Sequence, residues 1–216
     1  MALSKVDFNN INVTPAASKA LKWNSSANGF ETGDLVGSMV LLSTQTASSS
    51  STISFTSGID DTYDSYVFKF INIHPATDGA SFQFNLSTDS GSNYNVVKTT
   101  TSFFAYNNEA NTSTSLSIDG ATDLAQSTSD QILASNNGIG NDNDQSGSGY
   151  LQIFNPSSSV FVKHFLSRFQ YYVDIDYTKE NYIAGYGNTT NSIDAVRFKM
   201  SSGNIDSGVI KLYGIS

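Results

Sequence analysis

The stretch YVFKFINIHPATDGASFQFNLS, residues 66–87, decides the fold class. Its first eight residues, Tyr66–Ile73, are almost continuously apolar, which is typical of a central strand covered on both faces. In Ser81–Ser87 apolar and polar residues alternate, which predicts a strand with one face in water. The turn His74–Gly79 between them ends in the Asp-Gly pair that is frequent in turns. We therefore expect residues 66–87 to form a β-hairpin.

The same period of two recurs on both sides of this hairpin. Further strands are expected at Leu35–Thr44, which ends in the serine-rich run Ala47–Ser51, and at Thr52–Thr56, Tyr150–Phe154, Val160–Phe165 and Phe169–Tyr177. The stretch Asn107–Gly149 is polar and has the least regular pattern, as functional or mobile loops have. About eight to ten short strands joined by polar turns predict an all-β, jelly-roll-like antiparallel β-sandwich.

The clearest hairpin is expected at the end of the chain, where Val196–Met200 and Ser207–Tyr213 flank a turn with Gly203 and Asn204. Because side chains alternate along a strand, the apolar and the polar positions separate onto two faces. We expect one set to point into the core: Val196, Phe198, Met200, Ile210 and Leu212. Arg197 and Lys199 are then expected to face solvent or a neighbouring subunit.

Composition excludes several other classes of protein. Ser, Thr and Asn make up more than a third of the 216 residues, whereas charged residues are only 14 % and aromatic residues reach 12 %. A disordered chain is poor in aromatics, and a helical bundle needs more strong helix formers. Because the chain has no cysteine, disulfides, cysteine-ligated metals and a cysteine nucleophile are excluded.

Charge and hydropathy limit the partners. A net charge of −8 disfavours binding to nucleic acid and to an anionic membrane surface. Met1–Asp7 lacks the apolar core of a signal peptide, and the apolar stretch Met39–Leu42 is far too short to span a bilayer. We therefore expect a protein that is made in the cytoplasm and leaves the cell, if at all, by lysis inside a particle.

Residues 1–34 differ from the sandwich expected at 35–216. Within them, Phe8–Val13 is expected to form a short strand, and Pro15–Trp23 one or two helical turns. Two interpretations remain open, a loosely ordered tail and an arm that docks on a partner. The single tryptophan favours docking, and the apolar side chains of such an anchor would be Phe8, Ile11, Val13 and Trp23.

The sequence contains little that points to catalysis. The two histidines are His74, in a turn, and His164, in an apolar strand; neither belongs to a His-x-His or His-Glu-x-x-His zinc motif. There is no Gly-x-Ser-x-Gly elbow and no phosphate-binding Gly-x-x-x-x-Gly-Lys loop, although a Ser-His-Asp triad is not excluded by composition. We expect no enzyme and no cofactor.

Two acidic turns, Asp60–Asp64 and Asp142–Gln145, offer oxygen ligands of the kind that Ca²⁺ takes. Neither matches an EF-hand loop, because the glycine and the terminal glutamate are missing at the required spacing. Solvated turns without a metal are the simpler interpretation. A pair of carboxylates for glycoside hydrolysis is conceivable, but nothing in the pattern singles out two of them.

Aromatic residues beside amides and carboxylates are more informative. Five of them are candidates for a binding surface: Phe103, Phe104 and Tyr106 before the long polar stretch, and Tyr182 and Tyr186 at a glycine-rich turn. A flat aromatic ring with planar hydrogen-bonding groups beside it is what sugar binding needs. The same residues also suit a sandwich core or a subunit interface, so both interpretations remain open.

Three patches carry a resemblance to a known group of proteins. They are Ala20–Gly33, Tyr66–Gly79 followed by Ser87–Tyr94, and Ile193–Ile205 continued through Gly208–Gly214. These patches resemble segments of tail-fibre and virion proteins of marine tailed phages. The resemblance implies a jelly-roll-like sandwich, often trimeric, with an N-terminal virion anchor, and it implies no catalytic residues.

These observations lead to three hypotheses. The first is a non-enzymatic structural protein of a tailed-phage virion, such as a tail fibre, knob or capsid decoration. It would be anchored to other virion proteins through residues 1–34 and associate as a homotrimer. The second is a carbohydrate-binding adhesin that contacts glycans on the host surface. The third and weakest is an enzyme that degrades polysaccharide.

Overall fold

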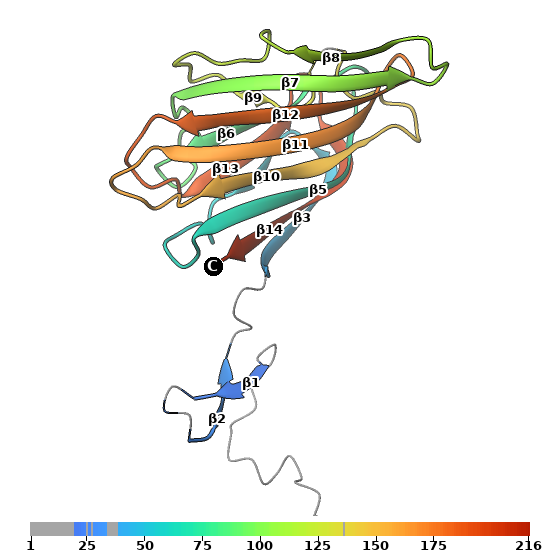
Figure 1. The fold of residues 1–216 in the computed structure, drawn as a ribbon. Coiled ribbons are helices and arrows are strands. Elements are labelled where there is room, and N and C mark those ends of the chain that lie inside the picture. Colours follow the sequence, from blue (N-terminus) through green and yellow to red (C-terminus); the bar gives the residue numbers. More distant parts are fainter. Residues whose placement is uncertain (1–19, 25, 27, 34–38, 136) are drawn as a thin grey trace, which may run out of the picture. The chain divides into compact units, whose positions relative to one another are not determined.

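The computed structural model describes residues 20–24, 26, 28–33, 39–135 and 137–216. The chain divides into two compact units, residues 1–38 and 39–216. The boundary expected after residue 34 lies in 34–38, outside the described residues. The described residues form strands and turns without a helix, and the larger unit is the antiparallel all-β sandwich that the alternation predicts (Figure 1).

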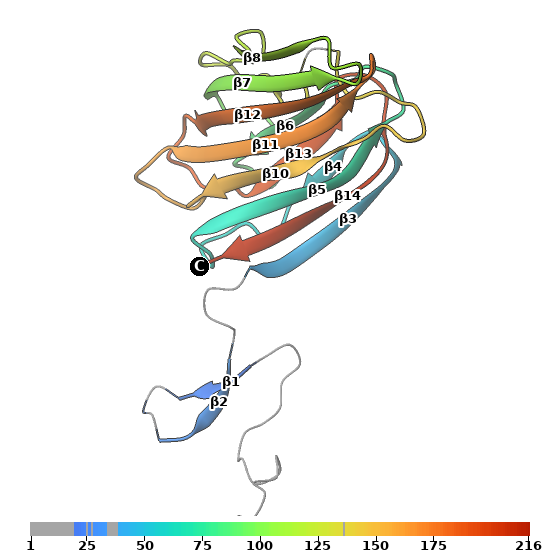
Figure 2. The same ribbon diagram turned by 45° about the vertical axis from the view of Figure 1, so that its right-hand side comes forward.

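Two sheets of unequal size make up this unit. The larger contains, in spatial order, β3 (Val40–Ser50), β14 (Ile205–Ile215), β5 (Ser65–Pro75), β10 (Gly147–Phe154), β11 (Lys163–Val173), β12 (Tyr177–Gly187), β7 (Lys98–Asn108) and β8 (Thr114–Ile118). The smaller contains β4 (Ile53–Phe55), β13 (Ala195–Met200), β6 (Phe82–Ser87) and β9 (Gln131–Ile132). Figure 2 shows the smaller sheet behind the larger one.

Eight of these strands are connected as a jelly roll. They are, in chain order, β3, β4, β5, β6, β9, β10, β13 and β14. Of these, β3, β14, β5 and β10 lie side by side in the larger sheet, so the first strand of the jelly roll is next to the eighth and the third is next to the sixth. The other four form the smaller sheet in the order β4, β13, β6 and β9. The remaining four, β11, β12, β7 and β8, extend the larger sheet beyond β10 and double its width.

An aromatic cluster holds the two sheets together. Phe198 of the smaller sheet packs edge to face against Phe68 and Phe70 of the larger one, with ring centroids 5.2 Å apart in both pairs. Its ring also stacks on Phe82 at 5.8 Å. All four side chains are at most 2 % exposed. The inward positions expected at the C-terminal end, Val196 and Met200 with Ile210 and Leu212, are buried as well, which confirms those faces.

Both expected hairpins are wrong, although their strands exist. β5 and β6 belong to different sheets, and so do β13 and β14. In each case the short connection crosses the sandwich, so that the two inward faces oppose each other across the core. Strand β5 is also not covered on its outer face, where Lys69 and Ile71 are exposed. Conversely, Asn85 of β6 is 2 % exposed, because the Nζ of Lys98 lies over it and donates to its Oδ1 at 2.6 Å.

Other predictions about strands, turns and loops also need correction. The serine-rich run lies inside β3 except for Ser51. The strand expected at 160–165 begins only at Lys163, the first residue of β11. The strand expected at 169–177 ends with β11 at Val173, and a turn leads from there to β12. The predicted glycine-rich turn 184–187 lies within β12, where the missing side chain of Gly185 leaves room for Phe165 and Thr100. The polar stretch 107–149 contains β8, β9 and the start of β10.

The smaller unit contains a two-stranded hairpin of β1 (Ala20–Trp23) and β2 (Phe30–Gly33). The helical turns expected up to Trp23 are therefore wrong for residues 20–23, and residues 15–19 lie outside the described part. Trp23 stacks on Phe30 across the hairpin, with ring centroids 4.5 Å apart, and remains 62 % exposed. The other anchor candidates, Phe8, Ile11 and Val13, are also outside the described residues.

A buried lysine gives the sandwich a characteristic pH dependence. The Lys98 side chain is fully buried and donates to Asn85 Oδ1 and to the Val96 carbonyl at 2.6 and 2.9 Å. Burial lowers the pKa of Lys98 to about 8, which nearby Asp130 raises and Arg197 lowers further. An unfolded lysine keeps its proton to about pH 10.4. Between these values the unfolded state binds more protons, so stability increases with pH.

We therefore expect the free energy of unfolding to rise by about 2 kcal/mol from pH 8 to pH 10. Above pH 10 it should fall, since burial raises the pKa of Tyr66 to about 12 and an unfolded tyrosine ionises near 10. Urea melts across this range test the expectation. The Lys98→Met variant should show a flatter rise, and an identical pH profile for the two proteins would contradict the assignment.

Candidate functional site

The five aromatic candidates divide between the two faces of the larger sheet. Phe103, Tyr182 and Tyr186 lie on the outer face, away from the smaller sheet, whereas Phe104 and Tyr106 lie on the inner face. Phe103 and Tyr182 are directly opposite each other on β7 and β12, and their rings stack at 4.7 Å with an interplanar angle of 6°. Phe104 instead stands opposite Asn181. The structure therefore forms two surfaces from residues that were expected to form one.

On the outer face, one row of side chains crosses the whole sheet. Each member stands directly opposite the next on the neighbouring strand: Ile118, Phe103, Tyr182, Arg168, Tyr150, Lys69, Lys211 and Thr44. We call these eight residues the outer row. It contains three cations and no carboxylate, so it is basic within a chain of net charge −8.

Contacts within the outer row order its polar groups. The guanidinium of Arg168 lies 5.2 Å from the ring centroid of Tyr182 and pairs with Glu180 on the adjacent strand. The Tyr182 hydroxyl donates to the other Glu180 carboxylate oxygen at 2.9 Å, an interaction that raises the pKa of Tyr182. The hydrogen bond from Arg168 in turn lowers the pKa of Glu180. The row thus presents fixed aromatic faces beside ordered charges.

The outer face is also the main exposed apolar surface of the larger unit. Eight large hydrophobic side chains, each at least 36 % exposed, project from it: Leu41, Ile71, Phe103, Leu116, Ile118, Tyr150, Phe154 and Leu166. Scattered single hydrophobic residues are normal on a protein surface, but eight exposed ones on one face of a single sheet indicate an interaction site.

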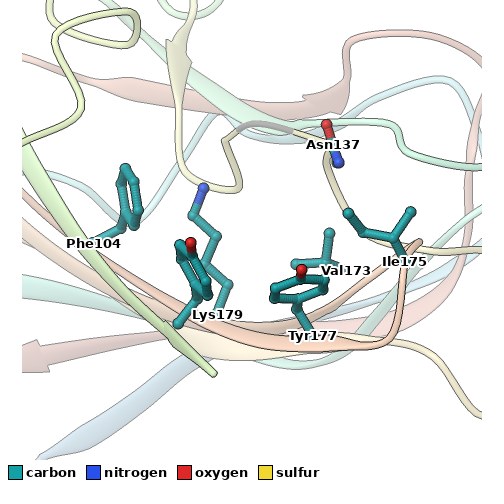
Figure 3. A pocket seen from close by; sticks show the side chains of 7 residues that line it. Phe104, Asn137, Val173, Ile175, Tyr177 and Lys179 are labelled. Atoms are coloured by element: carbon teal, nitrogen blue, oxygen red, sulfur yellow. The ribbon is translucent and has the colours of Figure 1, made fainter. Parts of the chain in front are cut away.

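The second surface is a pocket of about 220 Å³ at the inner face (Figure 3). It is lined by Phe104, Tyr106, Asn137, Val173, Ile175, Tyr177 and Lys179. Figure 3 shows Lys179 between Phe104 and Tyr177, with Asn137 on the opposite wall. We call these seven residues the inner pocket.

The rings of the inner pocket are packed against one another. Tyr106 lies between Phe104, stacked at 6.0 Å, and Tyr177, edge to face at 5.3 Å. The aliphatic side chains of Val173 and Ile175 complete the apolar wall. Lys179 contributes the single charged group of the lining, and Asn137 a side-chain amide. A flat apolar wall with one cation and one amide suits a small ring that bears polar substituents.

Two wider depressions are less enclosed. One lies on the outer face around His164, Tyr186 and Leu166, and it is mostly apolar. The other is polar and contains His74, whose Nδ1 lies 2.6 Å from the Gln145 carbonyl oxygen. Tyr186 thus lies apart from the outer row, beside His164, with ring centroids 6.3 Å apart.

Neither histidine of the described chain has a hydrogen bond to a serine or an aspartate. The described residues likewise contain no group of three or more His, Cys, Asp or Glu that could hold a metal ion. Of the two acidic turns, the first is ordered by its own contacts, since Asp60 accepts hydrogen bonds from the Thr62 amide and the Tyr66 hydroxyl. In the part of the chain described, no helix is long and apolar enough to cross a membrane.

Sequence reasoning missed Lys179, Tyr177, Arg168 and Tyr150. The signal that finds them is the register of β10, β11, β12 and β7, which places them beside the aromatic candidates. Comparison with known proteins adds no further guide, because no family model, curated protein or solved structure matches this chain.

Proposed function

We propose that the chain is a non-enzymatic structural component of a tailed-phage virion, displayed on the particle as a fibre, knob or capsid decoration. Copies associate through the outer face of the eight-stranded sheet, and residues 1–34 attach them to other virion proteins. The resemblance of three sequence patches to virion proteins supports the assignment to a phage virion. The observation that supports a structural role is the exposed apolar outer face, in a chain that is otherwise rich in Ser, Thr and Asn.

The size of this face suits a stable contact. Eight strands at roughly 4.8 Å spacing and up to 11 residues in length give a face of about 1,000 Å². A standard protein interface needs about 800 Å² from each partner. Aromatic and arginine side chains such as Tyr150, Tyr182 and Arg168 are also the residue types enriched at the centres of interfaces.

The charge of the chain supports a second copy of it as the partner. If two outer rows met face to face, Arg168, Lys69 and Lys211 would meet the same cations, which is unfavourable. The rest of the chain is acidic, so the outer row of one copy matches a different surface of the next. Head-to-tail contacts form a closed ring when the rotation between copies closes, and a trimer is the smallest such ring; a trimer is the assembly that we propose.

Sedimentation velocity tests this proposal. The full chain should sediment as a trimer. The Tyr150→Glu variant should sediment as a monomer, because the substitution places a carboxylate in the buried contact. Its melting curve should be unchanged. Phe161→Glu is the matched control, since Phe161 is 67 % exposed in the loop before β11 and is not part of the sheet, and it should leave the trimer intact. A wild-type monomer at every concentration would overturn the proposal.

A second candidate function, a carbohydrate-binding adhesin, is favoured by the inner pocket. Three aromatic rings, an amine and an amide are the groups that hold a sugar ring and its hydroxyls. A glycan array tests it, since an adhesin should retain specific glycans. Loss of that retention in a Tyr177→Ala variant that still folds would assign the binding to this pocket.

A further inference from the structure

The inner pocket is built around a buried cation. The Lys179 side chain is 5 % exposed, and its Nζ lies 4.0 Å from the ring centroid of Phe104. Among the described residues, Nζ has one hydrogen-bond acceptor, the Ser135 carbonyl oxygen at 3.2 Å. An ammonium group has three protons to donate. The buried Lys179 ammonium therefore has N–H groups left to donate to a ligand in the pocket.

No acidic side chain is among the seven lining residues, so the pocket itself does not neutralise this charge. Burial lowers the pKa of Lys179, and the Asp119 carboxylate acts in the opposite direction from outside the lining. A charged ligand group that entered the cavity would find the ammonium poorly solvated. Hydrogen bonds to ions are strong under these conditions. An anionic group is therefore the complement of this end of the pocket.

The remaining lining restricts the ligand further. At about 220 Å³ the cavity lies below the 300–1,000 Å³ of pockets for drug-sized molecules, so it holds one ring and not an oligosaccharide. Tyr106 and Tyr177 offer ring faces and hydroxyls, and Asn137 offers an amide. These groups match a ring with apolar C–H faces and hydroxyl substituents better than a bare phosphate or a flat aromatic acid.

We propose that the inner pocket binds a monosaccharide unit that carries a carboxylate, such as a hexuronic acid, with the Lys179 ammonium on the carboxylate and the Tyr106 and Tyr177 rings against the sugar. This inference rests on the adhesin function and narrows it to acidic glycans. The amide of Asn137 and the tyrosine hydroxyls then form hydrogen bonds with the sugar hydroxyls. Specificity comes from the buried ammonium, because a neutral sugar brings no anionic acceptor to it and leaves the Ser135 carbonyl as its one hydrogen-bond acceptor among the described residues.

Titration calorimetry of the full chain with three probes tests the inference. The probes are methyl glucuronide, its neutral amide and methyl glucoside. The glucuronide should bind about 10- to 100-fold more tightly than the other two, as a hydrogen bond to a charged group implies. Lys179→Met, which keeps the aliphatic stem, should abolish this preference, whereas Lys22→Met, at an exposed lysine of β1, should leave it unchanged.

A second variant covers the case in which Lys179→Met does not fold. Tyr177→Leu should weaken the glucuronide and the glucoside equally and keep the preference, because it removes stacking and not charge. Equal binding of glucuronide and glucoside by the wild type would overturn the inference and leave the adhesin function standing. Acetate binding as tightly as the glucuronide would also overturn it. If neither the probes nor any glycan on an array bound, both proposals would fail.

Discussion

Replacement of Phe198 by alanine is expected to lower the free energy of unfolding by about 3–5 kcal/mol. The side chain is fully buried and its ring contacts Phe68 and Phe70 across the core and Phe82 beside it. Its removal leaves a cavity between the two sheets that rigid neighbouring rings cannot fill. The loss is a large part of the roughly 5–15 kcal/mol that stabilises a domain. Urea melts at one fixed protein concentration measure it.

The adjacent residue supplies the control. Lys199 points to the other face of β13, where its Nζ pairs with Asp130 at 3.1 Å and a third of its side chain is exposed. Lys199→Ala should therefore cost less than 1 kcal/mol. Equal losses for the two variants, or a larger loss at Lys199, would mean that the register of β13 is shifted by one residue.

The second large effect is expected at Gly149 in β10. A Cβ there would lie 2.2 Å from the Arg168 carbonyl oxygen and 2.8 Å from the Phe169 Cα, both backbone atoms of the neighbouring strand. Backbone in the middle of a sheet cannot move aside without disturbing its hydrogen bonds. Gly149→Ala is therefore expected to cost about 3 kcal/mol, the upper end of the usual range for overpacking.

Gly120 is the matched control for this substitution, because a Cβ at that position meets nothing within 4 Å. Gly120→Ala should change the free energy of unfolding by no more than about 0.5 kcal/mol. Thermal and urea melts of the two variants make the comparison. A Gly149→Ala protein as stable as the wild type would show that β10 and β11 lie farther apart than described.

The alternation of apolar and polar residues predicted the class of fold and the inward faces of its last two strands. Val196, Phe198 and Met200 are buried because period two is a local property of the backbone. Pairing is not local. A short turn such as Ser201–Asn204 connects two strands of one sheet or crosses between two sheets, and nothing in the turn residues distinguishes these outcomes. Both expected hairpins failed for this reason.

The extension of the larger sheet was harder to predict. β12 contains two glycines and several polar residues, which read as a turn, yet Gly185 lies where Phe165 and Thr100 leave no room for a side chain. Lys163 is fully buried in β11, with its Nζ bonded to backbone carbonyls including that of Phe161. Glycines and a buried lysine are accommodated in these strands by contacts with residues that are distant in sequence, and the local pattern does not reveal those contacts.

The same limit applies to the candidate surfaces. Residue type alone selected Phe103 and Tyr182, which do stack, and Phe104 and Tyr106, which do line a pocket. Their separation onto opposite faces follows from the register of β7 against β12. The charged partners Arg168 and Lys179 were not predicted, because they come from positions that face these aromatics only once the sheet is assembled.

The central claim is that the outer face is covered in the assembled protein. Hydroxyl-radical footprinting of the full chain, above and below its assembly concentration, tests this most directly. The account predicts that oxidation of Phe103, Tyr150 and Tyr182 falls several-fold on assembly, while that of Phe161 in its exposed loop stays the same. Equal oxidation of the three outer-face rings in the dilute and the assembled protein would contradict it.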